Sequence, residues 1–264
     1  MDNPDKKHYQ DIEALAREAG EIMLSAQLSR GDIDAKEGHA NLVTRYDSMV
    51  QERLRGGLAK ILPGSGFYGE EGAHSAFPDD EYTFIVDPID GTSNFIHDFA
   101  LSAIAIALVK RDLSLPTGHG CIYGLVYNPF TDELFSAMRG EGASLNGRPI
   151  HVSGAPLSES LVMFGTAPYY EGCSALAFDR AAKLLPQCVD VRRLGSAELD
   201  LCYVACGRAG MYFEPLIQPW DLAAGSIIVE EAGGYVTRWD GSPVDLTAAG
   251  SCLARSHSIH IDTL

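Results

Sequence analysis

Two aspartates stand three positions apart where an apolar run ends. The run 84–86 predicts a short strand, and Asp87 and Asp90 follow it directly. Pro88 stiffens the chain between them, and Gly91 allows a sharp bend after them. Two carboxylates at one strand end repel each other unless a cation lies between them, so the pattern is typical of a metal site. A plain turn of the Asp-Pro-x-Asp-Gly kind explains it equally well.

Two further acidic segments lie in comparable surroundings. Glu70 and Glu71 stand between two glycines in a predicted tight turn, after a short strand-like stretch. Asp221 follows Trp220 and stands at the start of a predicted helix. Taken singly, the first segment is a solvated acidic loop, and the second is an acid that favours the helix dipole by about 0.3–1 kcal/mol. The interpretation as a metal site therefore depends on all three segments together.

The three acidic segments form an ordered set that resembles a known family. GEE (69–71), DPIDGTSNF (87–95) and WDLAAG (220–225), in this order, resemble the inositol monophosphatase family of metal-dependent phosphatases. The likeness covers nearly the whole chain. It includes Lys36 with NLVTRYD (41–47), GLVYNPFTDELFSAMRGEGASLNGRPIHVS (124–153), RRLGSAELDLCYVACGRAG (192–210) and IIVEEAGG (227–234). Each piece is short, but the ordered combination is specific.

The resemblance implies a set of metal ligands. These are the carboxylates of Glu70, Asp87, Asp90 and Asp221, and the main-chain carbonyl of Ile89. By the resemblance, Glu70, Asp87 and the carbonyl hold a first Mg²⁺, and the three aspartates hold a second. Two or three ions are implied in each active site. Ligands that are all oxygen suit Mg²⁺ and not zinc.

The resemblance also implies how phosphate and water are bound. The backbone N–H groups of Gly91, Thr92 and Ser93, at the start of a helix, receive the phosphate anion. Asp47 and the Thr92 hydroxyl position and deprotonate the attacking water. Glu70 is a third catalytic candidate through a further bound metal, a point that stays open.

On the alcohol side of the substrate, the matching residues are Gly195, Ser196, Ala197 and Glu214, together with Asp90 and Asp221. Glu214 can accept hydrogen bonds from ring hydroxyls, or it can be a surface acid before a proline, and both interpretations stay open. The chain departs from the family at Asn41, where Asp is common. Asn41 is not among the matched ligands. The difference therefore bears on local hydrogen bonding and on the binding of a weak third metal ion.

Elementary electrostatics agrees with this arrangement. Four carboxylates repel a phosphate dianion, because the Coulomb energy has the wrong sign. Two or three divalent cations reverse that sign, clamp the attacking and leaving oxygens, and make a bound water ionise near neutral pH. Phosphoryl transfer itself needs mainly positioning and charge neutralisation.

The elements that must position these residues follow from hydrophobic periodicity. Helices are predicted at 12–26 and 46–61. Strands are predicted at 84–86, 103–109, 122–127 and 133–137, with a hairpin loop at 128–132. Beyond Ser153, strands at 161–165, 189–194 and 211–213 alternate with helices at 174–185, 197–206 and 221–232.

The predicted fold class is a layered α/β (α+β) sandwich in an αβαβα arrangement. Residues 1–153 form an α+β lobe with a mainly antiparallel sheet, which carries the GEE and DPIDGTS motifs. Residues 154–264 form an α/β lobe, which carries Gly195–Ala197, Glu214 and Asp221. No linker separates the two, so we expect one integrated catalytic unit.

Composition restricts the partners. The 264 residues include 36 acidic and 20 basic side chains, a net charge of −16, and no long basic run, so nucleic acid is not expected as a partner. No apolar stretch approaches the roughly 20 residues that span a bilayer, and no signal peptide is recognised. We therefore expect a cytoplasmic protein with no membrane partner. The cysteine and histidine spacings do not suggest zinc or redox chemistry.

The predicted function is Mg²⁺-dependent hydrolysis of a small phosphate monoester by metal-activated water, with inositol 1-phosphate as the favoured substrate. By the resemblance we also expect inhibition by Li⁺ and a homodimer. Substrates of the same chemistry stay open: fructose 1,6-bisphosphate, histidinol phosphate, 3′-phosphoadenosine 5′-phosphate and NADP. The alternative from a different class of function is a member of the family that binds a partner and has no catalytic activity.

Overall fold

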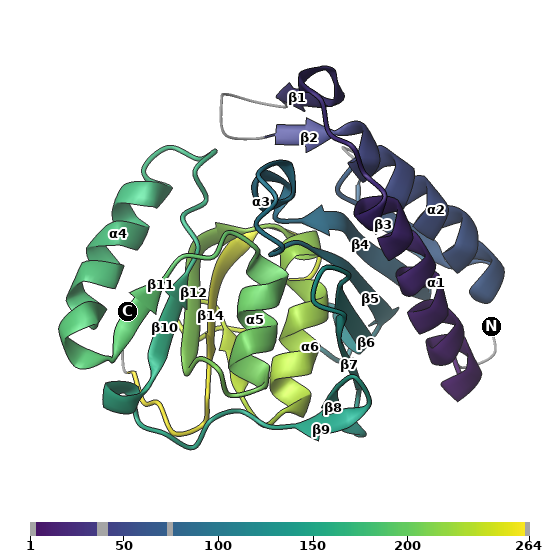
Figure 1. The fold of residues 1–264 in the computed structure, drawn as a ribbon. Coiled ribbons are helices and arrows are strands. Elements are labelled where there is room, and N and C mark those ends of the chain that lie inside the picture. The colour runs from purple at the N-terminus through teal and green to yellow at the C-terminus, as the bar shows by residue number, and fades with distance from the viewer. Residues whose placement is uncertain (1–3, 36–41, 73–75, 262–264) are drawn as a thin grey trace.

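Five layers build the molecule (Figure 1). The computed structural model describes residues 4–35, 42–72 and 76–261. The layers are, in order, a helix pair, a seven-stranded sheet, a second helix pair, a five-stranded sheet and a single helix. The first pair is α1 (Lys6–Leu24) and α2 (Arg45–Ile61), the second pair is α5 (Ala197–Ala205) and α6 (Ala223–Glu231), and the single helix is α4 (Cys173–Leu184). Three clusters of buried apolar residues fill the spaces between layers. The predicted αβαβα sandwich is confirmed.

The outer helix pair follows from the apolar stripes in the sequence. Helix α1 begins six residues before the predicted start at residue 12, because Asp5 caps it by accepting hydrogen bonds from the backbone N–H groups of Lys7 and His8 at 3.0 and 3.1 Å. Helix α2 agrees with its prediction to within one residue, and Thr44 caps it. The buried faces of both helices pack on the seven-stranded sheet.

The seven-stranded sheet has the strand order β3-β4-β5-β6-β7-β8-β9. Only β3 and β4 pair in parallel, so the predicted, mainly antiparallel sheet is confirmed. Every residue of β4 is buried, because helices cover both faces of the sheet. The strands are β3 Gly66–Gly69, β4 Tyr82–Asp90, β5 Ala103–Arg111, β6 His119–Asn128, β7 Glu133–Met138, β8 Gly142–Leu145 and β9 Arg148–Ile150.

The five-stranded sheet is mixed and has the order β11-β10-β12-β14-β13. β10 runs parallel to β11 and β12, whereas β14 runs antiparallel to β12 and β13. The sequence did not predict β13 and β14, because their apolar runs are short. The strands are β10 Leu161–Phe164, β11 Asp190–Arg192, β12 Met211–Ile217, β13 Tyr235–Thr237 and β14 Gly250–Arg255.

Helices α5 and α6 form the middle layer (Figure 1). Seven of the nine residues in each are buried, including Glu198 and Asp200 of α5. A helix between two sheets has no solvent face, which explains why neither helix shows a strong apolar stripe. The start of each helix faces the same end of the molecule as the end of β4 (Figure 1).

Two local predictions were wrong in ways that affect the site. β4 does not end before the aspartates but continues through Asp90, with an irregular register between Asp87 and Asp90. Asp221 does not start α6; it ends a 3₁₀ turn, Pro219–Asp221, where Pro219 fixes the backbone torsion that begins the turn. A short helix, α3 (Thr92–Ile96), follows β4.

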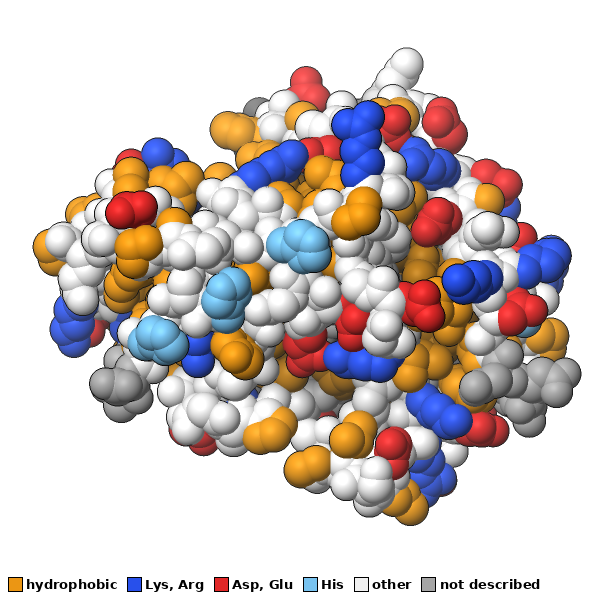
Figure 2. Space-filling model, turned by 90° about the horizontal axis from the view of Figure 1, so that it is seen from below, with side chains coloured by type: hydrophobic (Ala, Val, Ile, Leu, Met, Phe, Trp, Pro, Cys, Tyr) orange, Lys and Arg blue, Asp and Glu red, His pale blue; other side chains and the backbone are white. Residues whose placement is uncertain are grey.

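Smaller features complete the chain. Strands β1 (Ile33–Ala35) and β2 (Leu42–Thr44) pair antiparallel ahead of α2. The face drawn in Figure 2 mixes acidic and basic side chains. No helix in the described part of the chain is long and apolar enough to cross a membrane. The division near residue 153 stays a prediction.

Candidate active site

The acidic residues singled out in the sequence, apart from Asp47, line one cavity of about 850 Å³. It lies where β4 ends, where α3 and α5 begin, and beside the 3₁₀ turn that precedes α6. Of the described residues in its wall, only Arg193 is basic. The wall is therefore strongly negative, since seven acids also line it: Glu70, Glu71, Asp87, Asp90, Asp200, Glu214 and Asp221.

A β-bulge brings the two aspartates of β4 together. Asp87 pairs with Ala105 of β5, but Asp90 pairs with Ala103, so β4 has one extra residue over this stretch. In a regular strand, residues three apart point to opposite faces, and the extra residue cancels that alternation. The backbone N–H of Ile89 donates to Asp87 Oδ1 at 2.9 Å and fixes the first carboxylate.

Asp221 completes a cluster of three carboxylates. Oxygen atoms of Asp87, Asp90 and Asp221 all lie within 4.8 Å of one another. Burial, and next to it the negative charge of Glu70, raises the pKa of both Asp87 and Asp221. Charges of one sign held this closely away from water are costly unless a cation joins them, and an all-oxygen donor set fits Mg²⁺.

Glu70 lies apart from the trio. It lines the same cavity and its charge acts on Asp87 and Asp221, but it is not in the group that lies within 4.8 Å. Of the four predicted carboxylate ligands, the structure therefore gathers three closely and places the fourth on the same cavity wall. The Ile89 carbonyl also lines the cavity and accepts a hydrogen bond from the Thr92 hydroxyl at 3.1 Å.

Asp90 also holds the start of α5. Its Oδ2 accepts hydrogen bonds from Ser196 Oγ at 2.5 Å and from the Glu198 backbone N–H at 2.8 Å, while its Oδ1 accepts from the Ala197 N–H at 3.1 Å. Burial raises the pKa of Asp90, and these donors act in the opposite direction. Ser196 and Ala197, predicted as substrate contacts, thus contact Asp90 while they line the cavity beside Gly195.

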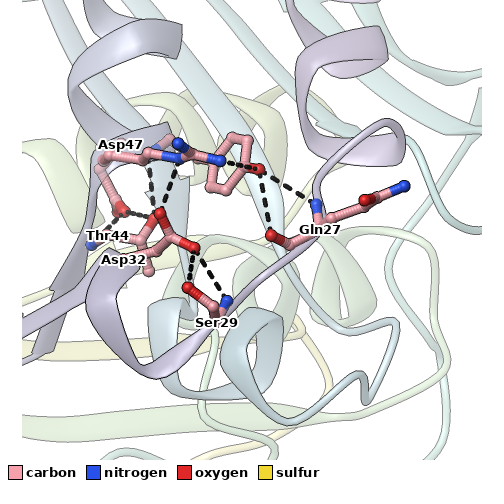
Figure 3. Close-up of polar contacts among 7 residues, drawn as sticks. Gln27, Ser29, Asp32, Thr44 and Asp47 are labelled. Atoms are coloured by element: carbon pink, nitrogen blue, oxygen red, sulfur yellow. Dashed lines mark hydrogen bonds and ion pairs between the residues drawn. The ribbon is translucent and has the colours of Figure 1, made fainter.

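Asp47 and Thr92, the pair that the family resemblance implies for handling water, lie in contact although they are 45 residues apart. Thr92 Oγ1 lies 3.2 Å from Asp47 Oδ1, and Asp47 is fully buried. Its other oxygen, Oδ2, accepts from the backbone N–H and the hydroxyl of Thr44 at 2.8 and 2.6 Å (Figure 3). The capping box of α2 therefore fixes the carboxylate that faces Thr92.

Gly91, Thr92 and Ser93 form the turn into α3 on the cavity wall. Gly91 has φ +83°, and a Cβ there would lie 2.8 Å from the carbonyl oxygen of Leu101, so the turn requires glycine. The Asn94 side chain donates to the carbonyl oxygens of Leu101 and Leu194, both at 2.8 Å. These contacts tie α3 to the segment that precedes α5.

Glu214, at the cavity wall in β12, is 9% exposed, so it is not a surface acid. Its carboxylate accepts hydrogen bonds from the Tyr212 hydroxyl and, at 2.8 Å, from the Ala167 N–H. A Cβ on Gly165 would lie 2.2 Å from the carboxylate carbon, so only glycine leaves room for this side chain. Burial raises the pKa of Glu214.

Sequence reasoning missed two buried acids in the first turn of α5. Asp200 lines the cavity, and its Oδ1 has no hydrogen-bond partner among the described residues. Glu198 is fully buried and accepts hydrogen bonds from the start of α6. The sequence does contain a signal for them, because both acids stand inside an otherwise apolar helix. A buried polar role explains acids in such a helix better than a solvent-exposed helix face does. Asn41 and Lys36 lie outside the described residues.

Comparisons with known proteins agree with this geometry. The model of the inositol monophosphatase family matches residues 5–264. The inositol-1-monophosphatase of Synechocystis sp. is 39% identical over 231 residues, 86% of this chain and 77% of that protein.

Two solved structures have the same fold over almost all of their length. Extragenic suppressor protein suhB from Bartonella henselae gives a TM-score of 0.83 with 32% identity, over 95% of this chain and 94% of that one. The IMPase of Thermotoga maritima gives 0.82 with 29% identity, over 96% and 93%. The chain belongs to the inositol monophosphatase family and is a phosphatase of this superfamily.

Proposed function

We propose that this protein hydrolyses inositol 1-phosphate in a Mg²⁺-dependent reaction. The observation that carries the proposal is the cluster of Asp87, Asp90 and Asp221, within 4.8 Å of one another on the wall of the 850 Å³ cavity. A phosphate ester can enter such a negative cavity only after cations reverse its charge. The family is Mg²⁺-dependent in general, and the donor atoms fit that ion.

In this proposal five groups hold two or three Mg²⁺ ions. They are the carboxylates of Glu70, Asp87, Asp90 and Asp221 and the carbonyl of Ile89. When bound, the ions supply charge neutralisation for the phosphoryl group and lower the pKa of water. The bulge in β4 and the 3₁₀ turn hold three of these carboxylates close together.

Asp47 and Thr92 handle the proton. The Thr92 hydroxyl contacts Asp47 Oδ1 at 3.2 Å and can accept a hydrogen bond from the attacking water. The water proton then passes through the hydroxyl to the carboxylate, which Thr44 holds in place. Glu70, on the same wall, is the second candidate for orienting this water. Such general-base help contributes about 10²–10⁴-fold in rate.

The substrate lies between two sets of groups in this proposal. The N–H groups of Gly91, Thr92 and Ser93 face the phosphate. On the alcohol side stand Gly195, Ser196, Ala197 and Glu214, with Asp90 and Asp221 at the boundary. Glu214 supports a polyol leaving group, because a buried carboxylate is a strong acceptor for hydroxyl donors.

A panel of phosphate monoesters, assayed for phosphate release with Mg²⁺ and with EDTA, tests the proposal. We expect inositol 1-phosphate to have the highest kcat/KM of the panel, EDTA to abolish turnover, and Li⁺ to inhibit. The panel includes fructose 1,6-bisphosphate, histidinol phosphate, 3′-phosphoadenosine 5′-phosphate and NADP. Faster cleavage of one of these than of inositol 1-phosphate contradicts the proposed substrate. Turnover that continues in EDTA contradicts the proposed metal dependence.

The second candidate is a partner-binding protein without turnover. The likeness to the Nus factor SuhB of Pasteurella multocida, 34% identical over 236 residues, favours it, because that protein is named as a factor and not as an enzyme. The complete trio of carboxylates, two of them buried and the third half-buried, disfavours it, since a site without catalysis has no need for that electrostatic cost. Phosphate release decides between the two, because a binding protein turns over none of the panel. A homodimer and a cytoplasmic location stay predictions, which sedimentation and cell fractionation test.

A further inference from the structure

Glu198 is a buried acid for which the proposed chemistry has no role. It lies in the first turn of α5 and is 0% exposed. Its carboxylate oxygens accept hydrogen bonds from the backbone N–H groups of Ala224, at 3.2 Å, and Gly225. These two amides belong to the first turn of α6, where N–H groups have no partner within the helix.

The contact between Glu198 and α6 is built closely into the fold. A Cβ on Gly225 would lie 2.6 Å from Glu198 Oε2, so glycine is required for the carboxylate to approach the backbone. Burial raises the pKa of Glu198, and the two N–H donors at the helix N-terminus act in the opposite direction. Glu198 therefore fixes the position of the first turn of α6 relative to α5.

The starts of the same two helices lie next to two candidate ligands, Asp90 at the end of β4 and Asp221 in the 3₁₀ turn before α6. Asp90 accepts hydrogen bonds from the Ala197 and Glu198 amides and so holds α5. Glu198 then holds α6 through Gly225, and Asp221 lies two residues before α6 begins. The chain of contacts runs from one candidate ligand, through the starts of α5 and α6, to the other.

We propose that Glu198 is a positioning residue that sets Asp221 at its distance from Asp90 and thereby prepares the cluster for Mg²⁺. This inference rests on the proposed function, because it assumes that the trio binds the metal. Partners of metal ligands orient the ligands they touch, and losing them typically weakens metal affinity by about 10–100-fold. Glu198 acts one step further out, through the backbone that carries Asp221.

The test compares Glu198→Gln with a matched control, Glu231→Gln. Glu231 lies at the other end of α6 and also accepts a backbone hydrogen bond, from Gly142 at 3.0 Å, but does not line the cavity. Gln keeps the shape of Glu198, but its amide nitrogen cannot accept, so only one of the two backbone hydrogen bonds can remain. Mg²⁺ affinity is measured by calorimetry on each full-length protein well below its unfolding temperature, and metal-free melting in EDTA is measured in parallel.

We expect Glu198→Gln to weaken Mg²⁺ binding by about tenfold and Glu231→Gln to leave it unchanged within about twofold. Hydrogen exchange of the Ala224 and Gly225 amides should be faster in Glu198→Gln. A purely structural residue would lower the melting temperature without moving the affinity of the folded protein. Mg²⁺ affinity that is unchanged in Glu198→Gln, or equally reduced in both variants, overturns the inference.

Gly225→Ala disturbs the same contact from the other side, where the new Cβ would also meet Leu201, and keeps Glu198 itself. It is the second variant if Glu198→Gln does not fold, and its Mg²⁺ affinity should also fall by about tenfold. Unchanged affinity in Gly225→Ala contradicts the proposed role. If the wild-type protein binds no Mg²⁺, both the proposed function and this inference are wrong. If the wild-type protein binds Mg²⁺ and the variants bind it equally well, only this inference is wrong.

Discussion

The two sheets present carboxylates to the cavity in different ways. β4, in the seven-stranded sheet, supplies two carboxylates that lie within 4.8 Å of a third, so negative charge accumulates there. β12, in the five-stranded sheet, supplies Glu214, which a hydroxyl and a backbone N–H already hydrogen-bond. The first arrangement calls for cations, and the second is suited to accept further donors from a polyol. Metal binding and substrate recognition should therefore respond to different substitutions.

The largest effect is expected on the β4 side. Asp87→Asn removes a candidate ligand and should lower kcat by about 10³-fold or more, equivalent to about 4 kcal/mol of barrier. The matched control is Asp240→Asn, because Oδ1 of Asp240 also accepts the N–H of the residue two positions on, at 2.9 Å, outside the cavity. Steady-state rates at saturating Mg²⁺ measure both. A wild-type kcat in Asp87→Asn would contradict the assignment of the metal cluster.

Loss of the proton-handling hydroxyl should have the next largest effect. Thr92→Ala should lower kcat by about 10²-fold, with KM and Mg²⁺ dependence little changed. Thr92→Ser keeps the oxygen that contacts Asp47 and serves as the control. The two variants are compared by kcat and KM on one substrate. Equal losses in both would mean that the threonine methyl group, and not its hydroxyl, is what matters.

A smaller and more selective effect is expected on the β12 side. Glu214→Gln should lower kcat/KM for inositol 1-phosphate by about tenfold, roughly the value of one hydrogen bond to a charged group. p-Nitrophenyl phosphate, whose leaving group has no ring hydroxyls, should be cleaved at nearly the wild-type rate. The ratio of the two kcat/KM values is the measurement. An equal fall for both substrates would place Glu214 in the chemical step and erase the distinction between the sheets.

The last comparison separates the two aspartates of β4 by stability and not by activity. In EDTA, Asp87→Asn should raise the free energy of unfolding, because it relieves repulsion. Asp90→Asn should lower it by about 1–3 kcal/mol, since one amide oxygen cannot replace both carboxylate oxygens that hold Ser196, Ala197 and Glu198. Urea unfolding measures the difference. A free energy of unfolding that does not fall in Asp90→Asn would show that Asp90 does not support α5.

Local patterns in the sequence predicted much of the fold. The stripe of α2 and the hairpin between β6 and β7 depend on neighbours along the chain, so periodicity and turn residues were enough to predict them. β14 was missed because its six residues gain strand character only from pairing with β12 and β13. The 3₁₀ position of Asp221 was missed because an acid before an apolar helix is usually its first residue.

Site residues that belong to a sequence motif were predictable. Site residues whose role depends on contacts between distant parts of the chain were not. The resemblance named Asp47, Thr92 and the three clustered aspartates, and the structure places each of them on one cavity or next to it. No local pattern indicates that Glu198 contacts amides 26 and 27 residues away. The β4 bulge was also hidden, because one extra residue shows only when the partner strand is known.

The most direct test of the account is a crystal structure of the protein grown with Mn²⁺, which takes the same oxygen ligands as Mg²⁺ and scatters anomalously. If the trio binds the metal, anomalous peaks will lie in contact with carboxylate oxygens of Asp87, Asp90 and Asp221. A cavity without such a peak at saturating Mn²⁺, or peaks bound only elsewhere on the protein, would contradict it.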